Sequence, residues 1–415
     1  PPRSTLFPYT TLFRSEWGDE SETIVVTKMM ASGQRLYTEI YNNHGPFVFL
    51  PGFILSMFGN YFIDTYRWIP IIFQWMSLIS IFFSPLFKTI KQRVFATIIL
   101  GSVMVHYLPL IYGHTYVYQT LSGLFMVMVM ALYILPSLMH RPVTALNRFI
   151  GSFILMTLPF LAITNAPFAV LGFIIVFNRT KFLSMGLGIC FALALNLGFL
   201  FIYGSWDGYI AYHYYLNLNV LYSGKGVLTF LLTLLRFYGD NFFHFLTLML
   251  ILTHVMIINH KQHWLNQLKG LLLIPMLVSL VVRGGNVFTL SGLMYLYALI
   301  GLSVALFVNL DYEMSRLEEI TQIFPLTAIS VVAIFLLFAP LKDNGFYIVF
   351  LPETDFSRIV KRVTTEEDRI LALSFRSYEY LIADRLPASK HFIYLSIQAK
   401  YNQRPYKDIH VSIAD

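Results

Sequence analysis

The chain has 415 residues, of which 57 % are hydrophobic and only 12 % are charged. A soluble domain carries about 25 % charged residues because its surface must be solvated, so this composition excludes an ordinary soluble protein and predicts a polytopic membrane protein. The net charge of +7 does not indicate a nucleic-acid partner, because the Lys and Arg residues are spread over short segments between apolar runs. The single cysteine, Cys190, excludes a disulfide framework.

Both ends of the chain differ from the rest. Residues 1–15 include TLFPYTTLFRS, which resembles the translation of a sequencing-library adapter, and they lack the charged and apolar regions of a signal peptide. We therefore expect residues 1–15 to be non-native and the natural chain to enter near Glu16, after the loss of one preceding helix. We expect the C-terminal end to be truncated as well.

Acidic residues open the next segment, residues 16–59. Asp19, Glu20 and Glu22 precede apolar residues at near i, i+4 spacing, and Gly33 follows them. This pattern predicts an amphipathic helix that lies on a membrane surface, with its acids at the N-terminal end and its last turn before Gly33.

Polar and aromatic residues follow the predicted helix. They are Tyr37, Glu39, Tyr41, Asn43 and His44, and they lead into Gly45-Pro46 and an apolar segment. Helix capping explains the acids, since an acid at a helix start contributes about 0.3–1 kcal/mol, and an interfacial belt explains the aromatics. Catalysis explains both, and the spacing alone leaves the two interpretations open.

Apolar runs long enough, or nearly so, to cross a bilayer predict ten spans in an all-α membrane bundle. They are residues 66–87, 94–112, 117–138, 148–163, 166–178, 182–203, 242–259, 268–283, 287–309 and 322–340. One set of alternate connections carries ten cations and the other six, so the first set is expected to be cytoplasmic. The ten are Lys88, Lys91, Arg93, Arg141, Arg148, Arg179, Lys181, Lys261, Lys269 and Arg316.

This orientation defines the predicted domains. Residues 16–65 form an extracytoplasmic loop with amphipathic helices, residues 66–340 form the transmembrane bundle, and residues 341–415 face outward. The last region has ordinary charge density and short apolar runs around a helix-like stretch, which predicts a small, truncated α/β domain.

Two outward segments carry further candidate residues. Asp207 lies in an aromatic-rich loop that could stack on a sugar, although an interfacial belt explains the aromatics equally well. Arg283 lies at an outer helix end, where a guanidinium suits either a phosphate clamp or an interfacial anchor. No histidine has the spacing of a metal pair, so we expect no structural metal.

The segment 16–59 resembles the first extracytoplasmic loop of GT-C glycosyltransferases that use polyprenyl-phosphate sugars. This group includes the protein O-mannosyltransferases and the lipid A aminoarabinose transferase. The matching residues are Asp19-Glu20, Gly33, Tyr37, Glu39, His44 and Gly45-Pro46. A looser match extends to Arg283 and to the run Asp384, Arg385, Pro387 and Ser389.

The resemblance implies an inverting glycosyltransferase of the GT-C bundle type, and it places the catalytic role on Asp19. Glu20 is a second catalytic candidate. Arg283 and Lys28 are the candidates for binding the donor phosphate, and the candidate substrate-binding residues are Tyr37, Glu39, Tyr41, His44 and Asp207.

The implied partners are a polyprenyl-phosphate sugar donor, membrane lipids and a glycan, lipid or protein acceptor, at the outer face of the plasma membrane of a prokaryotic-type cell. No cofactor is implied with certainty. Residues 113–120 lack the second acid and residues 163–168 the lysine that many relatives carry, which leaves a divalent cation open.

Two other function classes compete with this interpretation. A transporter or lipid-linked-sugar flippase would carry charged residues within its spans, and these spans are almost free of them. An O-antigen polymerase or ligase would place its decisive cations in a large late outer loop and would usually lack a folded outer tail. The early acidic loop and the tail therefore favour the transferase.

Overall fold

A computed structural model of the chain describes residues 15–16, 18–107, 113–220, 232, 264–279, 282–283, 286–287, 348–349, 353–372 and 377–392. The chain is predominantly helical, as the composition and the apolar runs predicted. The predicted non-native segment 1–15 lies outside the described residues except for Ser15.

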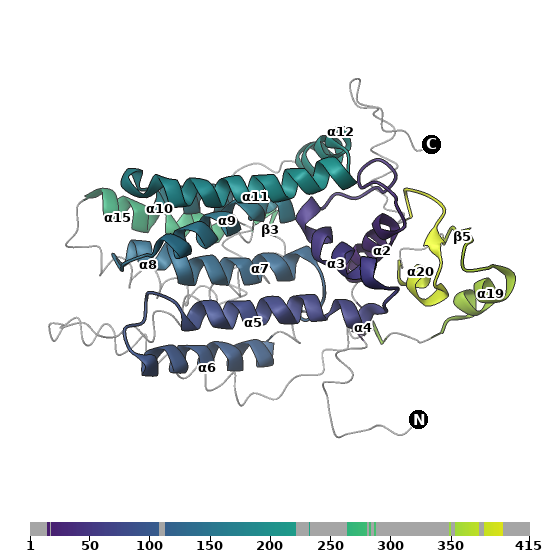
Figure 1. The fold of residues 1–415 in the computed structure, drawn as a ribbon, viewed down its shortest axis with the longest axis horizontal. Coiled ribbons are helices and arrows are strands. Elements are labelled where there is room, and N and C mark those ends of the chain that lie inside the picture. The colour runs from purple at the N-terminus through teal and green to yellow at the C-terminus, as the bar shows by residue number, and fades with distance from the viewer. Residues whose placement is uncertain are drawn as a thin grey trace.

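Helices run side by side along the long axis of the molecule (Figure 1). They are α5 (Trp68–Phe82), α6 (Ile90–Tyr107), α7 (Tyr118–Val129), η2 (Met130–Ile134), α8 (Leu135–Leu138), α9 (Ala145–Leu161), α10 (Ala166–Val176) and α11 (Phe182–Tyr203). Their bounds match six of the predicted apolar runs, since η2 and α8 continue α7. The helices α15 (Trp264–Leu271) and α16 (Leu273–Val278) overlap a seventh.

Two helical stretches in the described part of the chain are long and apolar enough to cross a membrane. They are Tyr118–Leu138, which is 94 % buried inside the protein, and Arg179–Tyr203, which is 33 % buried. The shorter apolar helical stretches Ala145–Leu161, Ile163–Val176 and Leu268–Val278 overlap three other predicted runs. The predicted runs 242–259 and 322–340, and nearly all of 287–309, lie outside the described residues.

Local sequence sets several helix boundaries and contacts. The Thr144 hydroxyl accepts a hydrogen bond from the backbone N–H of Asn147, 3.1 Å away, and so caps the start of α9. Helices α9 and α11 approach closely at Gly188, where an added Cβ would lie 2.3 Å from the carbonyl oxygen of Phe149. A small residue is required at that contact.

At one end of the bundle, α2 (Gly18–Ala31) is enclosed by protein (Figure 1). From Asp19 to Met30 every side chain is buried except those of Asp19, Glu22 and Lys28, which are half-buried. The prediction of a helix lying on the membrane surface is therefore wrong. The enclosing elements are α3 (Pro46–Phe58), α4 (Ile63–Tyr66) and α20 (Tyr378–Ala383).

The C-terminal region supplies part of this enclosure. Its elements are α19 (Asp355–Val363), β5 (Arg369–Ile370), α20 and β6 (Leu386–Pro387), and β5 pairs with β6 in parallel. Strand β1 (Ser15–Glu16) pairs antiparallel with β4 (Ile348–Val349). The hydroxyls of Ser21 and Ser377 lie 2.6 Å apart and join α2 to the tail, so the described tail packs directly on α2.

Helix α2 ends where the sequence predicted. The last helical residue is Ala31, and Gly33 has a φ of +95°, a left-handed conformation that glycine adopts without steric cost. The remaining short elements are η3 (Ile163–Asn165), η4 (Arg179–Lys181), α12 (Trp206–Tyr209), the π-helix η5 (Ile210–Val220), and the antiparallel pair β2 (Val282–Arg283) and β3 (Asn286–Val287).

Candidate functional site

The N-terminal turn of α2 presents two carboxyl groups one turn apart, Asp19 and Glu22. Both side chains are half-buried. The amide nitrogen of Gln119, at the start of α7, lies 3.4 Å from the Asp19 carboxylate and donates to it. The hydroxyl of Thr23 donates to the backbone carbonyl of Asp19 at 2.7 Å and fixes the first turn. The start of α2 therefore meets the start of α7 around a carboxyl pair.

Glu22 differs from Asp19 in its surroundings. Burial, and secondly the nearby Asp19 charge, raise the pKa of Glu22 to about 8, although the Asn42 amide opposes this by donating to the Glu22 carboxyl at 2.7 Å. Glu22 therefore holds a proton near neutral pH beside a second carboxyl group. Paired carboxyls whose environments differ in this way are typical of acid and base roles.

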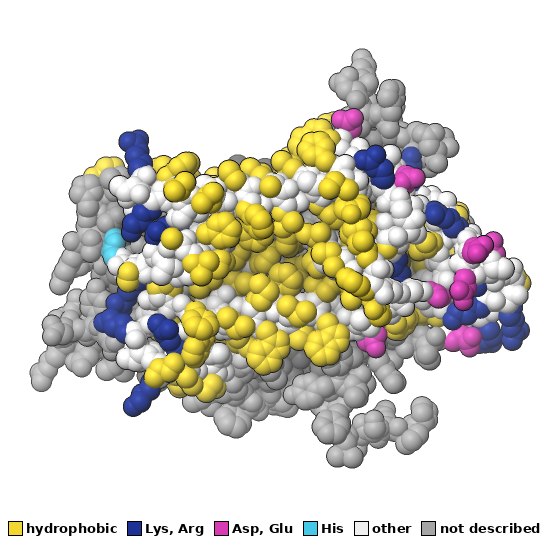
Figure 2. Space-filling model, in the orientation of Figure 1, with side chains coloured by type: hydrophobic (Ala, Val, Ile, Leu, Met, Phe, Trp, Pro, Cys, Tyr) yellow, Lys and Arg dark blue, Asp and Glu magenta, His cyan; other side chains and the backbone are white. Residues whose placement is uncertain are grey.

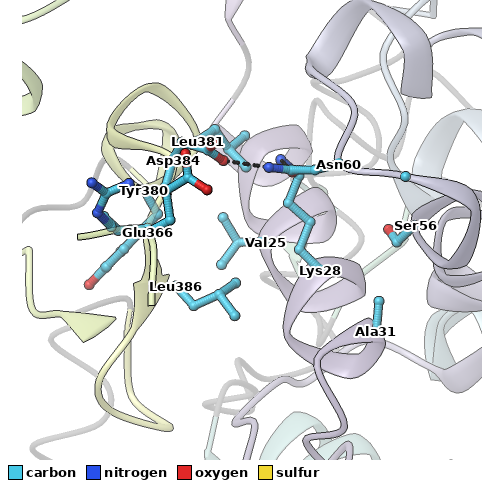
Figure 3. A pocket seen from close by; sticks show the side chains of 12 residues that line it. Val25, Lys28, Ala31, Ser56, Asn60, Glu366, Tyr380, Leu381, Asp384 and Leu386 are labelled. Atoms are coloured by element: carbon cyan, nitrogen blue, oxygen red, sulfur yellow. Dashed lines mark hydrogen bonds between the residues drawn. The ribbon is translucent and has the colours of Figure 1, made fainter. Parts of the chain in front are cut away.

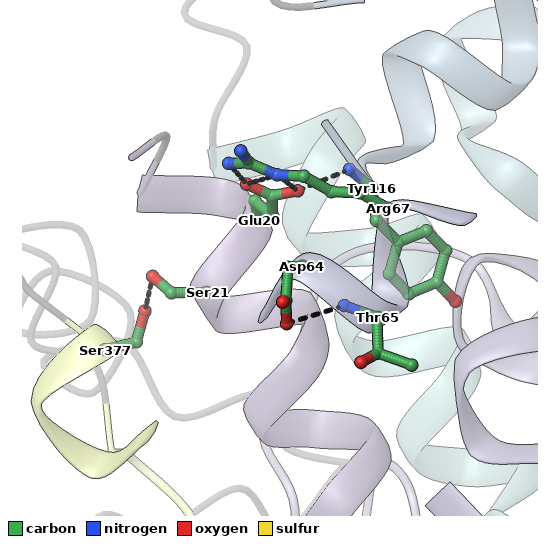
Figure 4. Close-up of polar contacts among 7 residues, drawn as sticks. All are labelled: Glu20, Ser21, Asp64, Thr65, Arg67, Tyr116 and Ser377. Atoms are coloured by element: carbon green, nitrogen blue, oxygen red, sulfur yellow. Dashed lines mark hydrogen bonds and ion pairs between the residues drawn. The ribbon is translucent and has the colours of Figure 1, made fainter. Parts of the chain in front are cut away.

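Glu20, the second catalytic candidate, is built into a buried ion pair that holds the start of α2. Its carboxylate forms an ion pair with Arg67, in which Nη2 lies 2.5 Å from Oε2 and Nε lies 2.9 Å from Oε1 (Figure 4). The backbone N–H of Tyr116 also donates to Glu20, at 2.9 Å. Both charged side chains are fully buried. With its oxygens bound to these donors and closed to solvent, Glu20 is not exposed to a reactant.

The segment 42–44 lies beside the carboxyl pair. Asn42 bridges Glu22 and the backbone N–H of His44, which donates to the Asn42 side-chain oxygen at 2.8 Å. The His44 ring packs on the ring of Tyr118, the neighbour of Gln119, with a centroid separation of 4.5 Å. Sequence reasoning identified His44, and the structure brings it to the same region as Asp19.

Residues of the π-helix η5 hold this segment in place. Asn217 donates to the carbonyl oxygen of Asn43 at 2.8 Å, and a ring nitrogen of the fully buried His213 lies 3.2 Å from the same oxygen. The other His213 ring nitrogen lies 3.0 Å from the carbonyl oxygen of Pro159. The sequence did not predict the roles of Asn217, His213, Gln119 and Arg67, because each of them contacts residues far away in the sequence.

Tyr37 and Tyr41 are built into the protein interior. The Tyr37 hydroxyl donates to the carbonyl oxygen of His44 at 2.6 Å, and burial raises the pKa of this phenol above its ordinary value. The Tyr41 ring packs edge-on against Tyr212, with centroids 4.8 Å apart. Both tyrosines shape the segment that carries His44.

Glu39 and Asp207 are exposed. The Glu39 carboxylate accepts a hydrogen bond from the backbone N–H of Arg35 at 2.7 Å, which closes its own turn. Asp207 lies on α12, whose Gly208 packs so closely on Tyr37 that an added Cβ would lie 2.2 Å from the Tyr37 carbonyl oxygen. Asp207 is thus beside the ordered aromatic cluster but on its outer surface.

Lys28 faces a different pocket from Asp19. Nine residues separate them, which is about two and a half helical turns, so they occupy opposite faces of α2. Lys28 donates to Asn60 at 2.6 Å, and Asn60 donates to Asp384 at 2.7 Å, in a pocket of about 280 Å³ between α2 and the tail (Figure 3). Burial lowers the pKa of Lys28. Lys28 therefore lies on the tail side of α2, away from the Asp19 carboxylate, and its expected role in binding the donor phosphate stays a prediction.

The second phosphate candidate, Arg283, lies in β2, and its side chain falls outside the described residues. Within the described ranges, no group of three or more His, Cys, Asp or Glu side chains is placed to hold a metal ion. A scan against protein-family models finds no match, and searches of curated proteins and of solved structures find no significant relative.

Proposed function

We propose that the chain is a multi-pass membrane glycosyltransferase of the GT-C type. It transfers a sugar from a polyprenyl-phosphate donor to an acceptor at the outer face of the plasma membrane, with Asp19 as the general base. The observation that carries the proposal is the half-buried pair Asp19 and Glu22 at the end of a helical bundle. The resemblance of residues 16–59 to the first loop of that family supports it.

The surface of the bundle supports the membrane assignment. Figure 2 shows a broad band of hydrophobic side chains over the middle of the bundle, with Lys and Arg side chains at the left end and both basic and acidic side chains at the right end. Trp75, Ile98, Leu183 and Phe201 on α5, α6 and α11 are each at least 60 % exposed. A water-soluble protein rarely leaves such a continuous apolar surface uncovered. A bilayer would cover it.

The charges at the two ends support the orientation. Between Asp64 and Asp207 the sequence contains no Asp or Glu, whereas the turns at the end opposite α2 carry Lys and Arg. Cytoplasmic connections are enriched in Lys and Arg. Asp19 and the tail would then lie at the outer face, where a flipped polyprenyl-phosphate sugar is presented.

The reaction needs one base and one stabiliser of negative charge. The acceptor oxygen forms a bond to the anomeric carbon while the bond from that carbon to the phosphate oxygen breaks, and its electron pair leaves with the polyprenyl phosphate. The hydroxyl proton passes to the Asp19 carboxylate. This single displacement inverts the anomeric carbon.

Asp19 is suited to this step by its neighbours. The Gln119 amide orients its carboxylate, and Glu22 stays neutral near pH 7, so only one negative charge stands beside the departing phosphate. We assign stabilisation of that phosphate to Arg283, because a guanidinium matches two phosphate oxygens. Glu20 holds α2 against Arg67 and so positions Asp19.

The test is sugar release from a panel of radiolabelled polyprenyl-phosphate sugars in membranes that contain the full chain. Asp19→Asn should lower release by about 100-fold or more, the scale of general-base catalysis. Asp64→Asn is the matched control, because Asp64 is an exposed acid on the neighbouring α4 whose carboxylate accepts from Thr65. Wild-type rates in Asp19→Asn would refute the catalytic assignment. No release with any donor from folded protein would favour a transporter or flippase.

A further inference from the structure

A second pocket lies at the end of the bundle opposite α2. It has a volume of about 350 Å³ and is lined by residues of η2, α8, α9, α10, η4 and α15. Helices α8, α10 and α15 lie at the left of Figure 1. This volume is in the range of sites that hold small ligands, roughly 300–1,000 Å³. Nothing in the proposed transfer reaction uses this pocket.

The charge of the pocket is entirely positive. Arg141, Arg148, Lys181 and Lys269 line it from four different segments of the chain, and its lining contains no Asp or Glu. Like charges gathered in one concave site repel one another, and a partly enclosed site screens that repulsion less than bulk water does. An anion in the pocket would offset the repulsion.

Hydrogen bonds fix part of this cationic lining. Arg148 donates from Nε to the Ser184 hydroxyl at 2.8 Å and from Nη1 to the carbonyl oxygen of Val143 at 2.5 Å. A guanidinium has five N–H groups, so Arg148 keeps donors for a ligand after making these two bonds. Lys269 reaches the end of α10, 3.4 Å from the Phe177 carbonyl oxygen. The pocket is therefore pre-formed on at least two sides.

Apolar side chains border the same pocket. The lining includes Val143, Ile175, Val176 and Phe177, and the Phe177 side chain is 47 % exposed. A free anion needs only the cations, whereas a lipid uses both the cations for its headgroup and the apolar rim for its chains. Basic pockets between helices on the cytoplasmic side are suited to anionic headgroups.

We propose that this pocket binds the phosphate-bearing headgroup of an anionic phospholipid in the cytoplasmic leaflet. Arg148 offers a fixed guanidinium to the phosphate. Lys181 of η4 and Lys269 of α15 would contact the same phosphate from other sides of the pocket. The proposal depends on the membrane part of the proposed function and is independent of glycosyl transfer.

The test is lipid binding to the purified full chain in a neutral detergent, measured by native mass spectrometry and by the shift in thermal midpoint. Phosphatidylglycerol is the probe, and phosphatidylcholine and inorganic phosphate are the comparison ligands. The variant Lys181→Gln/Lys269→Gln changes two solvent-accessible pocket residues. The control, Lys88→Gln/Lys91→Gln, removes the same charge from the same end outside the pocket.

We expect the wild-type chain and the control variant to bind phosphatidylglycerol equally. The affinity of the pocket variant for this lipid should be lower by about tenfold or more. Equal binding of phosphatidylcholine, or equal binding by the pocket variant, would overturn the proposal. Competition by inorganic phosphate at the same concentration as the lipid would show a simple phosphate site and overturn the lipid assignment. If the wild-type chain bound phosphatidylglycerol but released no sugar from any donor, only the proposed function would be contradicted.

Discussion

The buried ion pair between Glu20 and Arg67 predicts an unequal response to its two single substitutions. Glu20 accepts hydrogen bonds from Arg67 and from the Tyr116 backbone, and both charged side chains are fully buried. Replacing Glu20 by Leu leaves a guanidinium, which stays charged, and an unpaired backbone N–H. Replacing Arg67 by Met leaves a carboxyl that still accepts from Tyr116 and that can take up a proton.

The expected magnitudes follow from these partners. Breaking a buried pair by removing one partner costs about 3–5 kcal/mol of unfolding free energy, and an unsatisfied buried N–H costs about 1–3 kcal/mol more. Glu20→Leu should therefore destabilise the protein more than Arg67→Met. The double variant should be less destabilised than Glu20→Leu, because neither charge of the pair is left in the interior.

The assay is a double-mutant cycle on unfolding in one detergent, with both single variants and the double variant measured at pH 7. If each single variant lowered the unfolding free energy by less than about 1 kcal/mol, the pair would behave like an exposed one. That result would refute the structural role of Glu20 in holding α2.

Two further outcomes are expected. The pKa of Glu22 in the folded protein, about 8, exceeds its ordinary value of 4.5, so the folded state binds the extra proton between those pH values. Stability of the wild-type chain should then fall by up to about 1.4 kcal/mol per pH unit relative to Glu22→Gln as pH rises from 5 to 8; parallel thermal-midpoint curves would contradict this. On α11, Gly188→Ala should cost about 1–3 kcal/mol because its Cβ meets the α9 backbone. Gly198→Ala, with open space around it, should stabilise by about 0.5–1 kcal/mol in the same unfolding assay, and equal effects would refute the packing argument.

The helices could be predicted because their signal is local. Apolar runs bounded by polar turns gave α5, α6, α9, α10 and α11, and Gly33 gave the end of α2. The surroundings of α2 could not be predicted in this way. Contacts such as Ser21 with Ser377 join residues 356 positions apart, and no periodicity in either segment encodes them.

The candidate site was predictable to a similar degree. The acids and His44 stood out because charged and polar residues are rare in this chain, and the structure gathers Asp19, Glu22 and His44 around Asn42 and the start of α7. The directions in which Glu20 and Lys28 point could not be predicted from the sequence. Adjacent positions on a helix face different directions, so Glu20 turns toward Arg67 and Lys28 toward the tail.

The most direct test of the central claim is a side-by-side measurement of sugar release by the wild-type chain, Asp19→Asn and Asp64→Asn from one accepted polyprenyl-phosphate donor. The account predicts release by the wild type and by Asp64→Asn at matching rates, and a loss of about 100-fold or more in Asp19→Asn. Equal release by all three proteins would contradict it.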